Sequence, residues 1–166
     1  METVPLAATV KLGKLPAYVD PRSLSLAHYL DREVLPAPPP ALDLSTQVPE
    51  WPMYANDRLG DCTTAAAGHM IEAWTATASG ATVEVTEAAV LDAYDAVKIV
   101  DPATGGEGAV ELDVLKLWRR EGIGGHRIAA FAGVACGDRD LVSTGAWLFG
   151  GLYICLLYTS PSPRDS

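Results

Sequence analysis

Apolar side chains recur at helical spacing in three stretches of this 166-residue chain. The first stretch follows a turn-forming Asn-Asp-Arg-Leu-Gly-Asp run and predicts a helix over residues 62–78. Thr86 and Glu87 have the pattern of a helix cap, which predicts a second helix to about Val97. A third helix is predicted over about residues 111–120. The positions expected to face inward are Ala66, Ala67, Met70, Ile71 and Trp74, then Ala89, Val90, Ala93, Tyr94 and Val97, and finally Leu112, Leu115 and Trp118.

The other segments have weaker patterns. Short helices are predicted near residues 23–33 and over residues 138–144, whereas the apolar, β-prone run at residues 146–154 predicts a strand. Helices followed by the beginning of a strand run indicate an α+β domain, with a helical half and an incomplete β half.

The chain divides into three parts. Residues 1–40 form an N-terminal arm that ends in a stiff Pro-Ala-Pro-Pro-Pro linker. We expect this arm to pack on the domain, and a pro-segment that blocks a cleft is the alternative. Residues 41–154 form the domain itself, and its length fits a single domain.

Residues 155–165 read Cys-Leu-Leu-Tyr-Thr-Ser-Pro-Ser-Pro-Arg-Asp, which resembles a translated reading frame of a transposon-based sequencing adapter. We therefore expect residues 155–166 to be a non-native tail of a truncated, metagenomic fragment whose natural sequence is cut near Ile154. A natural Ser/Pro-rich tail is the alternative.

Cys62 carries the candidate chemistry. Asp61 is a good N-cap residue, so Cys62 is expected in the first turn of the first helix. The unpaired backbone N–H groups of that turn and the positive end of the helix dipole favour a thiolate over a thiol. A thiolate is the form in which cysteine acts as a nucleophile.

The same segment resembles the active-site stretch of papain-like cysteine peptidases. Asn56 stands six residues before Cys62, where the family has Gln, and Gly60 and Asp61 stand where the family has Gly and Ser. Weaker matches follow in the family's order over residues 40–123: Pro40-Ala-Leu-Asp43, then Val85-Thr-Glu87 with Val90-Leu-Asp92, then Gly105–Ala109 and Glu121-Gly-Ile123.

The resemblance implies a papain-like fold and a cysteine peptidase or a related amidase or acyl transferase. It implies Cys62 as nucleophile and the Asn56 side chain in the oxyanion hole. Gly60, Asp61 and Gly108 would bind a peptide or amide substrate, with the bare backbone of Gly108 on the cleft wall. No cofactor is implied.

Several residues depart from the family pattern. Asn56 is one methylene shorter than Gln, and Thr63 replaces the Trp that usually follows the nucleophile. Asp61 places a negative charge beside Cys62, which opposes ionisation of the thiol, although Arg58 could offset it. These departures favour an alternative, a non-catalytic papain-fold binding or scaffold module in which Cys62 is structural.

None of the three histidines is a good base for Cys62. His69 lies two helical turns away, roughly 10 Å along the axis, His126 fits a turn after a helix, and His28 has no motif around it. In the resembled family the base His and the orienting Asn come about 130–150 residues after the nucleophile. We expect both to be absent by truncation and this fragment to be inactive.

Composition and charge restrict the class of protein and the partners that it can have. A hydrophobic fraction of 49% fits a globular chain with a core. The net charge of −9 argues against a nucleic-acid partner. No apolar run is long enough for a bilayer, and the N-terminus lacks a signal-peptide pattern, so we expect a cytoplasmic protein that does not bind membranes. No Cys or His spacing suggests a metal site.

Overall fold

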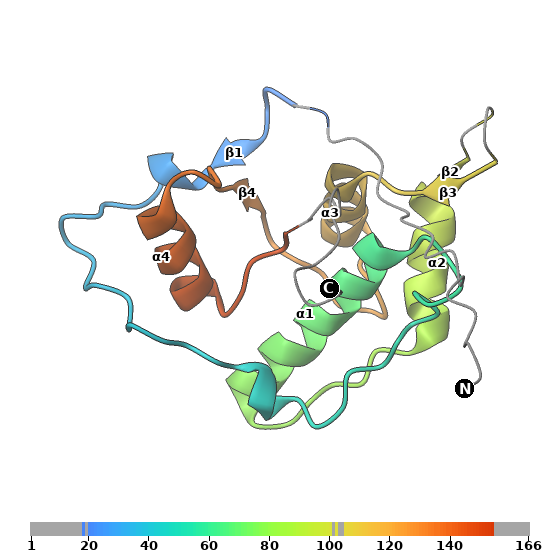
Figure 1. Cartoon of the computed structure of the whole chain (residues 1–166), viewed down its shortest axis with the longest axis horizontal. Helices are drawn as coiled ribbons and strands as arrows, with labels where there is room; N and C mark the ends of the chain where they lie inside the picture. The colour runs from blue at the N-terminus through green and yellow to red at the C-terminus, as the bar shows by residue number, and fades with distance from the viewer. Residues whose placement is uncertain (1–17, 19, 101, 103–104, 155–166) are drawn as a thin grey trace, which may run out of the picture.

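Three helices that pack on one another form the centre of the molecule in the computed structural model (Figure 1). The structure describes residues 18, 20–100, 102 and 105–154. The predicted helices are confirmed as α1 (Cys62–Ser79), α2 (Glu87–Val97) and α3 (Glu111–Arg120). The Thr86 hydroxyl accepts the backbone N–H of Ala89, which is the predicted cap of α2.

The core lies between these helices. Its fully buried members include Ile71 from α1, Val90 and Tyr94 from α2, and Val114 and Trp118 from α3. Trp74 stacks on Trp118 with ring centroids 5.5 Å apart, so both tryptophans serve the core.

The inward face of α3 differs in part from the prediction. Trp118 is buried as expected, but Val114 and Leu117 are the other buried positions, while Leu112 and Leu115 are half-buried. Hydrophobic spacing alone left two neighbouring stripes of α3 possible, and packing against α1 and α2 selected between them.

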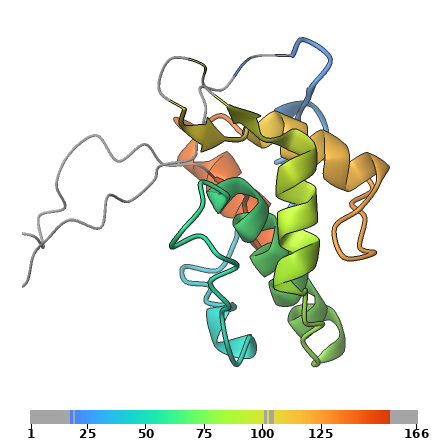
Figure 2. The same cartoon turned by 90° about the vertical axis from the view of Figure 1, so that its right-hand side faces the viewer.

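α2 runs back toward the beginning of α1, as the two views show together (Figure 1 and Figure 2). It is followed by a short antiparallel pair, β2 (Ile99–Val100) with β3 (Glu107–Gly108). This arrangement brings the C-terminal end of α2 and β3 to the end of α1 where Cys62 lies.

The fourth helix lies apart from this core, together with a second strand pair (Figure 1). α4 (Arg139–Phe149) packs on the 3₁₀ turn η1 (Leu26–His28), and β1 (Leu24–Ser25) pairs in parallel with β4 (Ala132–Gly133). A further 3₁₀ turn, η2 (Ser45–Gln47), contacts α1. The arm residues 24–28 therefore pack on the rest of the chain.

The strand predicted at residues 146–154 is wrong. Residues 146–149 are the last part of α4, and residues 150–154 are coil. Helix caps decide the outcome: the Asp138 carboxylate accepts the Leu141 N–H at 3.0 Å, and Gly150 ends the helix in the left-handed conformation at φ +68°.

The helix predicted near residues 23–33 is also wrong, because only a short strand and a 3₁₀ turn form there. Pairing of Leu24 and Ser25 with β4 fixes their backbone in an extended conformation, which outweighs local helical spacing. The described part of the chain is thus mixed helix and strand, in keeping with an α+β protein, although its sheets are two two-stranded pairs. The adapter-like residues 155–166 lie outside the described residues.

Candidate functional site at the start of α1

Cys62 is the first residue of α1, as the sequence predicts. Its side chain is a half-buried thiol, whereas Gly60 and Asp61 before it are buried. The main chain of Asp61 begins the helix, since its carbonyl accepts the Ala65 N–H at 2.9 Å and the Thr64 hydroxyl at 3.0 Å. The nucleophile candidate is therefore held on a rigid element at its N-terminal end.

The Asp61 carboxyl does not cap the helix that it precedes. Its side chain is fully buried, and neither oxygen has a hydrogen-bond partner among the residues that the structure describes. Burial raises the pKa of Asp61 to about 6, and the nearby charges of Glu87 and Asp57 act in the same direction, whereas its own backbone N–H and, more weakly, Arg58 oppose them. Arg58 is mostly exposed and instead pairs with Glu87 at 3.3 Å.

Tyr94 of α2 is a further buried polar residue whose electrostatic surroundings include Cys62. The tyrosine is 1% exposed, and its hydroxyl has no partner among the described residues. Burial raises the pKa of Tyr94, and the charge of Glu107 and, more weakly, those of Asp61 and Cys62 raise it further, while Lys98 lowers it. Tyr94 thus interacts electrostatically with the Asp61 carboxyl and the Cys62 thiol at the start of α1.

Asn56 lies in the loop that leads to Cys62. It is half-buried, its backbone N–H donates to the Met53 carbonyl at 3.0 Å, and its side-chain amide has no hydrogen bond to any residue described. An amide in this state keeps its N–H groups available for an oxygen atom of a ligand.

Gly108, predicted to lie on the wall of a substrate cleft, is paired with another strand of the same chain. Gly108 is buried in β3, opposite Ile99 of β2 in the antiparallel register. One edge of β3 is thereby occupied within the chain itself. The neighbouring residue Glu107 lies near Tyr94, which links this strand to the surroundings of Cys62.

The segment after α4 also reaches the first turn of α1. The Tyr153 hydroxyl donates to the Thr63 carbonyl at 2.7 Å, and the Trp74 indole N–H donates to the Phe149 carbonyl at 2.7 Å. Residues 149–153 therefore run along α1 from its fourth turn back to Thr63, and Tyr153 borders the site.

The histidines lie elsewhere in the fold. The Nε2 of His69 bonds to the Pro52 carbonyl at 2.7 Å, and His69 is a half-buried residue of α1. His126 forms a turn bridge with Ile123, and His28 ends η1 beside α4. Cys136, the other cysteine among the described residues, is exposed in the loop before α4.

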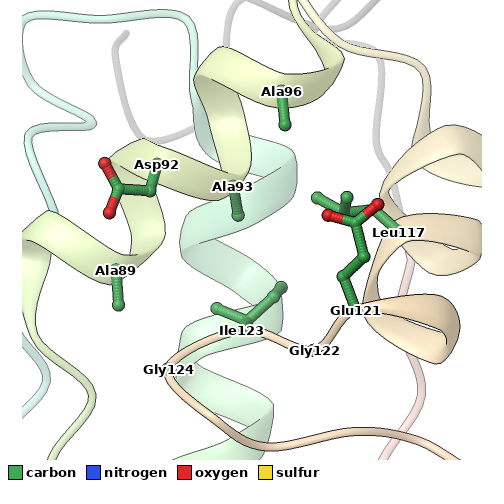
Figure 3. A pocket seen from close by; sticks show the side chains of 9 residues that line it. All are labelled: Ala89, Asp92, Ala93, Ala96, Leu117, Glu121, Gly122, Ile123 and Gly124. Carbon is green, nitrogen blue, oxygen red and sulfur yellow. The ribbon is translucent and has the colours of Figure 1, made fainter.

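Two hollows in the described surface lie away from Cys62 and Asn56. The larger, of about 270 Å³, lies between α2 and the end of α3, where Ala89, Ala93 and Ala96 face Leu117 and Glu121 (Figure 3). The smaller, of about 150 Å³, is bordered by Trp74, Trp118 and Arg127. Neither is lined by a residue of the predicted site.

Sequence reasoning missed three residues of this region. Tyr94 was predicted as core alone, and its electrostatic interaction with Cys62 depends on how α2 packs. Tyr54 and Glu72 form a buried hydrogen bond at 2.5 Å between the loop and α1. A signal for Glu72 existed: it follows Ile71 and stands four residues after Gly68, on the inward side of the helix.

No model of a known protein family matches this chain, and no curated protein or solved structure shows significant similarity to it. None of the helices in the described ranges is both long and apolar enough to cross a bilayer. The described residues also contain no cluster of three His, Cys, Asp or Glu side chains that could hold a metal ion.

Proposed function

We propose that this chain is the nucleophile-bearing part of a papain-like cysteine hydrolase, a peptidase or a related amidase or acyl transferase. Cys62 is the nucleophile, and Asn56 donates to the oxyanion. Gly60, Asp61 and Gly108 border the place of a peptide or amide substrate. The resemblance at residues 56–62 motivates the proposal, and the geometry at the start of α1 supports it.

The observation that carries the proposal is the concentration of unsatisfied polar atoms around Cys62. Among the described residues, four of the six buried side-chain polar atoms without a partner belong to Asp61, Thr63 and Tyr94. Buried polar groups are nearly always hydrogen-bonded in folded proteins, so unmet groups gathered at one place indicate a functional site. Asp61 and Thr63 adjoin Cys62, a half-buried thiol at a helix N-terminus, and Tyr94 interacts with it electrostatically.

The reaction would proceed by acyl transfer. The Cys62 thiolate attacks the carbonyl carbon, a C–S bond forms, and the electron pair moves to the carbonyl oxygen. The Asn56 amide and the backbone N–H of Cys62 stabilise that oxyanion. Its collapse expels the amine with a proton and leaves a thioester, which water or another acceptor then cleaves.

The proposed proton acceptor is a histidine that this sequence does not contain, because its three histidines are held at other places. In our proposal the chain alone therefore forms the thioester with an activated ester but does not turn over an amide. Such an ester needs no proton for its leaving group, so it tests the nucleophile and the oxyanion donor by themselves.

A second candidate function is a non-catalytic binding or scaffold module of the same fold. The observation that favours it is the pairing of Gly108 with Ile99, which occupies an edge that a substrate peptide would otherwise use. In this case Cys62 is a small residue of the interior with ordinary thiol reactivity.

The test uses the full chain with Cys136→Ser and Cys155→Ser, which leaves Cys62 as the single thiol. We expect iodoacetamide at pH 7 to alkylate Cys62 faster than it alkylates free cysteine. We also expect p-nitrophenyl acetate to acylate it, and Asn56→Ala to slow acylation by about tenfold or more while alkylation is unchanged, because only acylation develops an oxyanion.

Asp57→Ala is the matched control, since it removes an exposed side chain of the same loop. Equal alkylation rates for Cys62 and free cysteine would exclude the enzyme and leave the module. Equal acylation rates for the Asn56→Ala and Asp57→Ala variants would remove Asn56 from the oxyanion hole.

A further inference from the structure

We infer that Tyr54 is a positioning residue for the proposed reaction: it fastens the loop that carries Asn56 to the middle of the nucleophile helix. Tyr54 with Gly68 and Glu72 of α1 is called the Tyr54 clasp below. The inference rests on the proposed function for its catalytic meaning. Its structural content, the attachment of the loop to α1 by Tyr54, can be measured independently.

The backbone at the clasp is strained. Tyr54 and Ala55 have φ values of +54° and +66°, and they are the two non-glycine residues with positive φ among those described. Non-glycine residues avoid this region because the Cβ atom crowds the carbonyl oxygen, and their presence needs other contacts to maintain it. This reversal of the chain lies directly before Asn56, so it sets the direction in which the loop continues toward Cys62.

The Tyr54 ring provides such contacts. The ring fits where Gly68 exposes the helix backbone, since a Cβ atom at residue 68 would lie 2.9 Å from Cε2 of Tyr54. The His69 ring lies next to it, with centroids 5.1 Å apart. Any side chain larger than hydrogen at residue 68 would displace the tyrosine, and with it the turn at residues 54 and 55.

The hydroxyl of Tyr54 completes the clasp by donating to Oε1 of Glu72 at 2.5 Å. Glu72 is 2% exposed, and its other oxygen has no partner among the described residues. Burial and the adjacent carboxylate raise the pKa of Tyr54, so the phenol stays protonated and remains a donor. A buried acceptor that loses its donor destabilises the fold, so this hydrogen bond is costly to break.

A second hydrogen bond attaches the loop to α1 two residues before Tyr54. Nε2 of His69 bonds to the Pro52 carbonyl, and Trp51 meets the His69 ring edge-on. Residues 51–54 are thus fixed to residues 68–72 of the same helix that begins at Cys62. Both ends of the short stretch from Asn56 to Asp61 are therefore attached to α1, which fixes the Asn56 amide relative to the Cys62 thiol.

The experiment compares two reactions of Cys62 in the full chain with Cys136→Ser and Cys155→Ser. Alkylation by iodoacetamide requires only an accessible thiolate, whereas acylation by p-nitrophenyl acetate also uses the oxyanion donor. We expect Tyr54→Phe to slow acylation by about tenfold or more, because a small displacement of a positioned group has effects of this size. Alkylation should stay within about twofold of the parent rate.

Amide hydrogen exchange measures the clasp without reference to catalysis. Tyr54→Phe should speed exchange at residues 55–61 by about tenfold, the equivalent of one hydrogen bond. Tyr29→Phe is the matched control, because Tyr29 is 64% exposed. Glu72→Gln keeps an acceptor for the phenol and should retain most of the parent acylation rate.

A double variant and the hydrogen-exchange result distinguish failure of the Tyr54 clasp from failure of the proposed function. Tyr54→Phe leaves a buried carboxylate without a donor, so the double variant Tyr54→Phe, Glu72→Met removes both partners and should fold while still acylating slowly. Unchanged exchange at residues 55–61, or an equal loss of acylation and alkylation, overturns the clasp. An unreactive parent Cys62 overturns the proposed function, and exchange then still decides whether Tyr54 holds the loop.

Discussion

Asp61 and Cys62 are neighbours in the sequence, but the fold gives them different surroundings. The main chain of Asp61 begins α1, and its carboxyl is buried without a hydrogen-bond partner among the described residues, while the Cys62 thiol stays half-buried. The sequence placed an acidic residue beside the candidate nucleophile. Only the packed structure shows that this residue is the less accessible of the two, which raises its pKa.

The pKa of Asp61 predicts how stability depends on pH. Its pKa of about 6 lies above the ordinary value of 3.8, so the folded protein binds more protons than the unfolded chain between these values. The Asp61 contribution to the free energy of unfolding therefore falls as the pH rises from about 4 to about 6. We expect Asp61→Asn to melt at a higher temperature than the parent at pH 7.

This difference in melting temperature should shrink toward pH 4, where the native carboxyl is protonated. Asp57→Asn, at an exposed position in the same loop, is the control and should show no such trend. A constant difference between Asp61→Asn and the parent across pH 4 to 7 would contradict a buried, protonated Asp61.

At the scale of the elements, caps decided more than hydrophobic spacing did. Thr86 and Asp138 each accept the backbone N–H three residues later, and both are followed by helices. The sequence predicted α2 correctly because cap and periodicity agree there. At residues 146–154 the β-prone residues predicted a strand, whereas the cap at Asp138 favoured a helix. α4 formed and extends to Phe149, because backbone hydrogen bonds extend cooperatively from a capped start.

Removal of the Asp138 cap should therefore destabilise α4. Asp138→Ala is expected to lower the free energy of unfolding by about 1 kcal/mol, the usual cost of losing an N-cap side chain. Asp138→Asn keeps an oxygen acceptor for the Leu141 N–H and should lose less, although it weakens the ion pair with Arg32. Urea denaturation of both variants gives the comparison. Equal losses would show that the charge of Asp138 matters more than its cap.

At the scale of the whole molecule, the chain has a helical centre and a layer added to it. α1, α2 and α3 share the core cluster, whereas α4, η1 and the β1–β4 pair contact one another at one side of it (Figure 1). The added layer unites residues near both ends of the described chain. Its hydrogen bonds to α1 come from Trp74 with Phe149 and from Tyr153 with Thr63.

This organisation predicts that the layer of α4, η1 and the β1–β4 pair can unfold locally while α1, α2 and α3 stay folded. Leu26 is 7% exposed and lies against Gly145 of α4, where an added Cβ atom would be 3.3 Å from it. Leu26→Ala should remove about 2 kcal/mol or more of local packing. In hydrogen exchange, amides of residues 24–28 and 139–149 should then exchange faster, while those of α1 to α3 keep the parent rates.

Leu24→Ala is the matched control for this experiment, because Leu24 lies in the same segment but is 41% exposed. It should leave the exchange rates of α4 nearly unchanged. Faster exchange throughout α1 to α3 in Leu26→Ala would mean that the layer and the core unfold as one unit.

The sequence by itself determined α1, α2 and α3 and the place of Cys62 at a helix start, because periodicity, caps and turn residues are local and agree at these positions. Tertiary structure alone decided that residues 24–25 pair with residues 132–133, that Tyr94 interacts electrostatically with Cys62, and that Tyr54 bonds Glu72. These contacts join segments far apart in the chain, and their free energy depends on the packing of whole elements. No local pattern of residues contains that information.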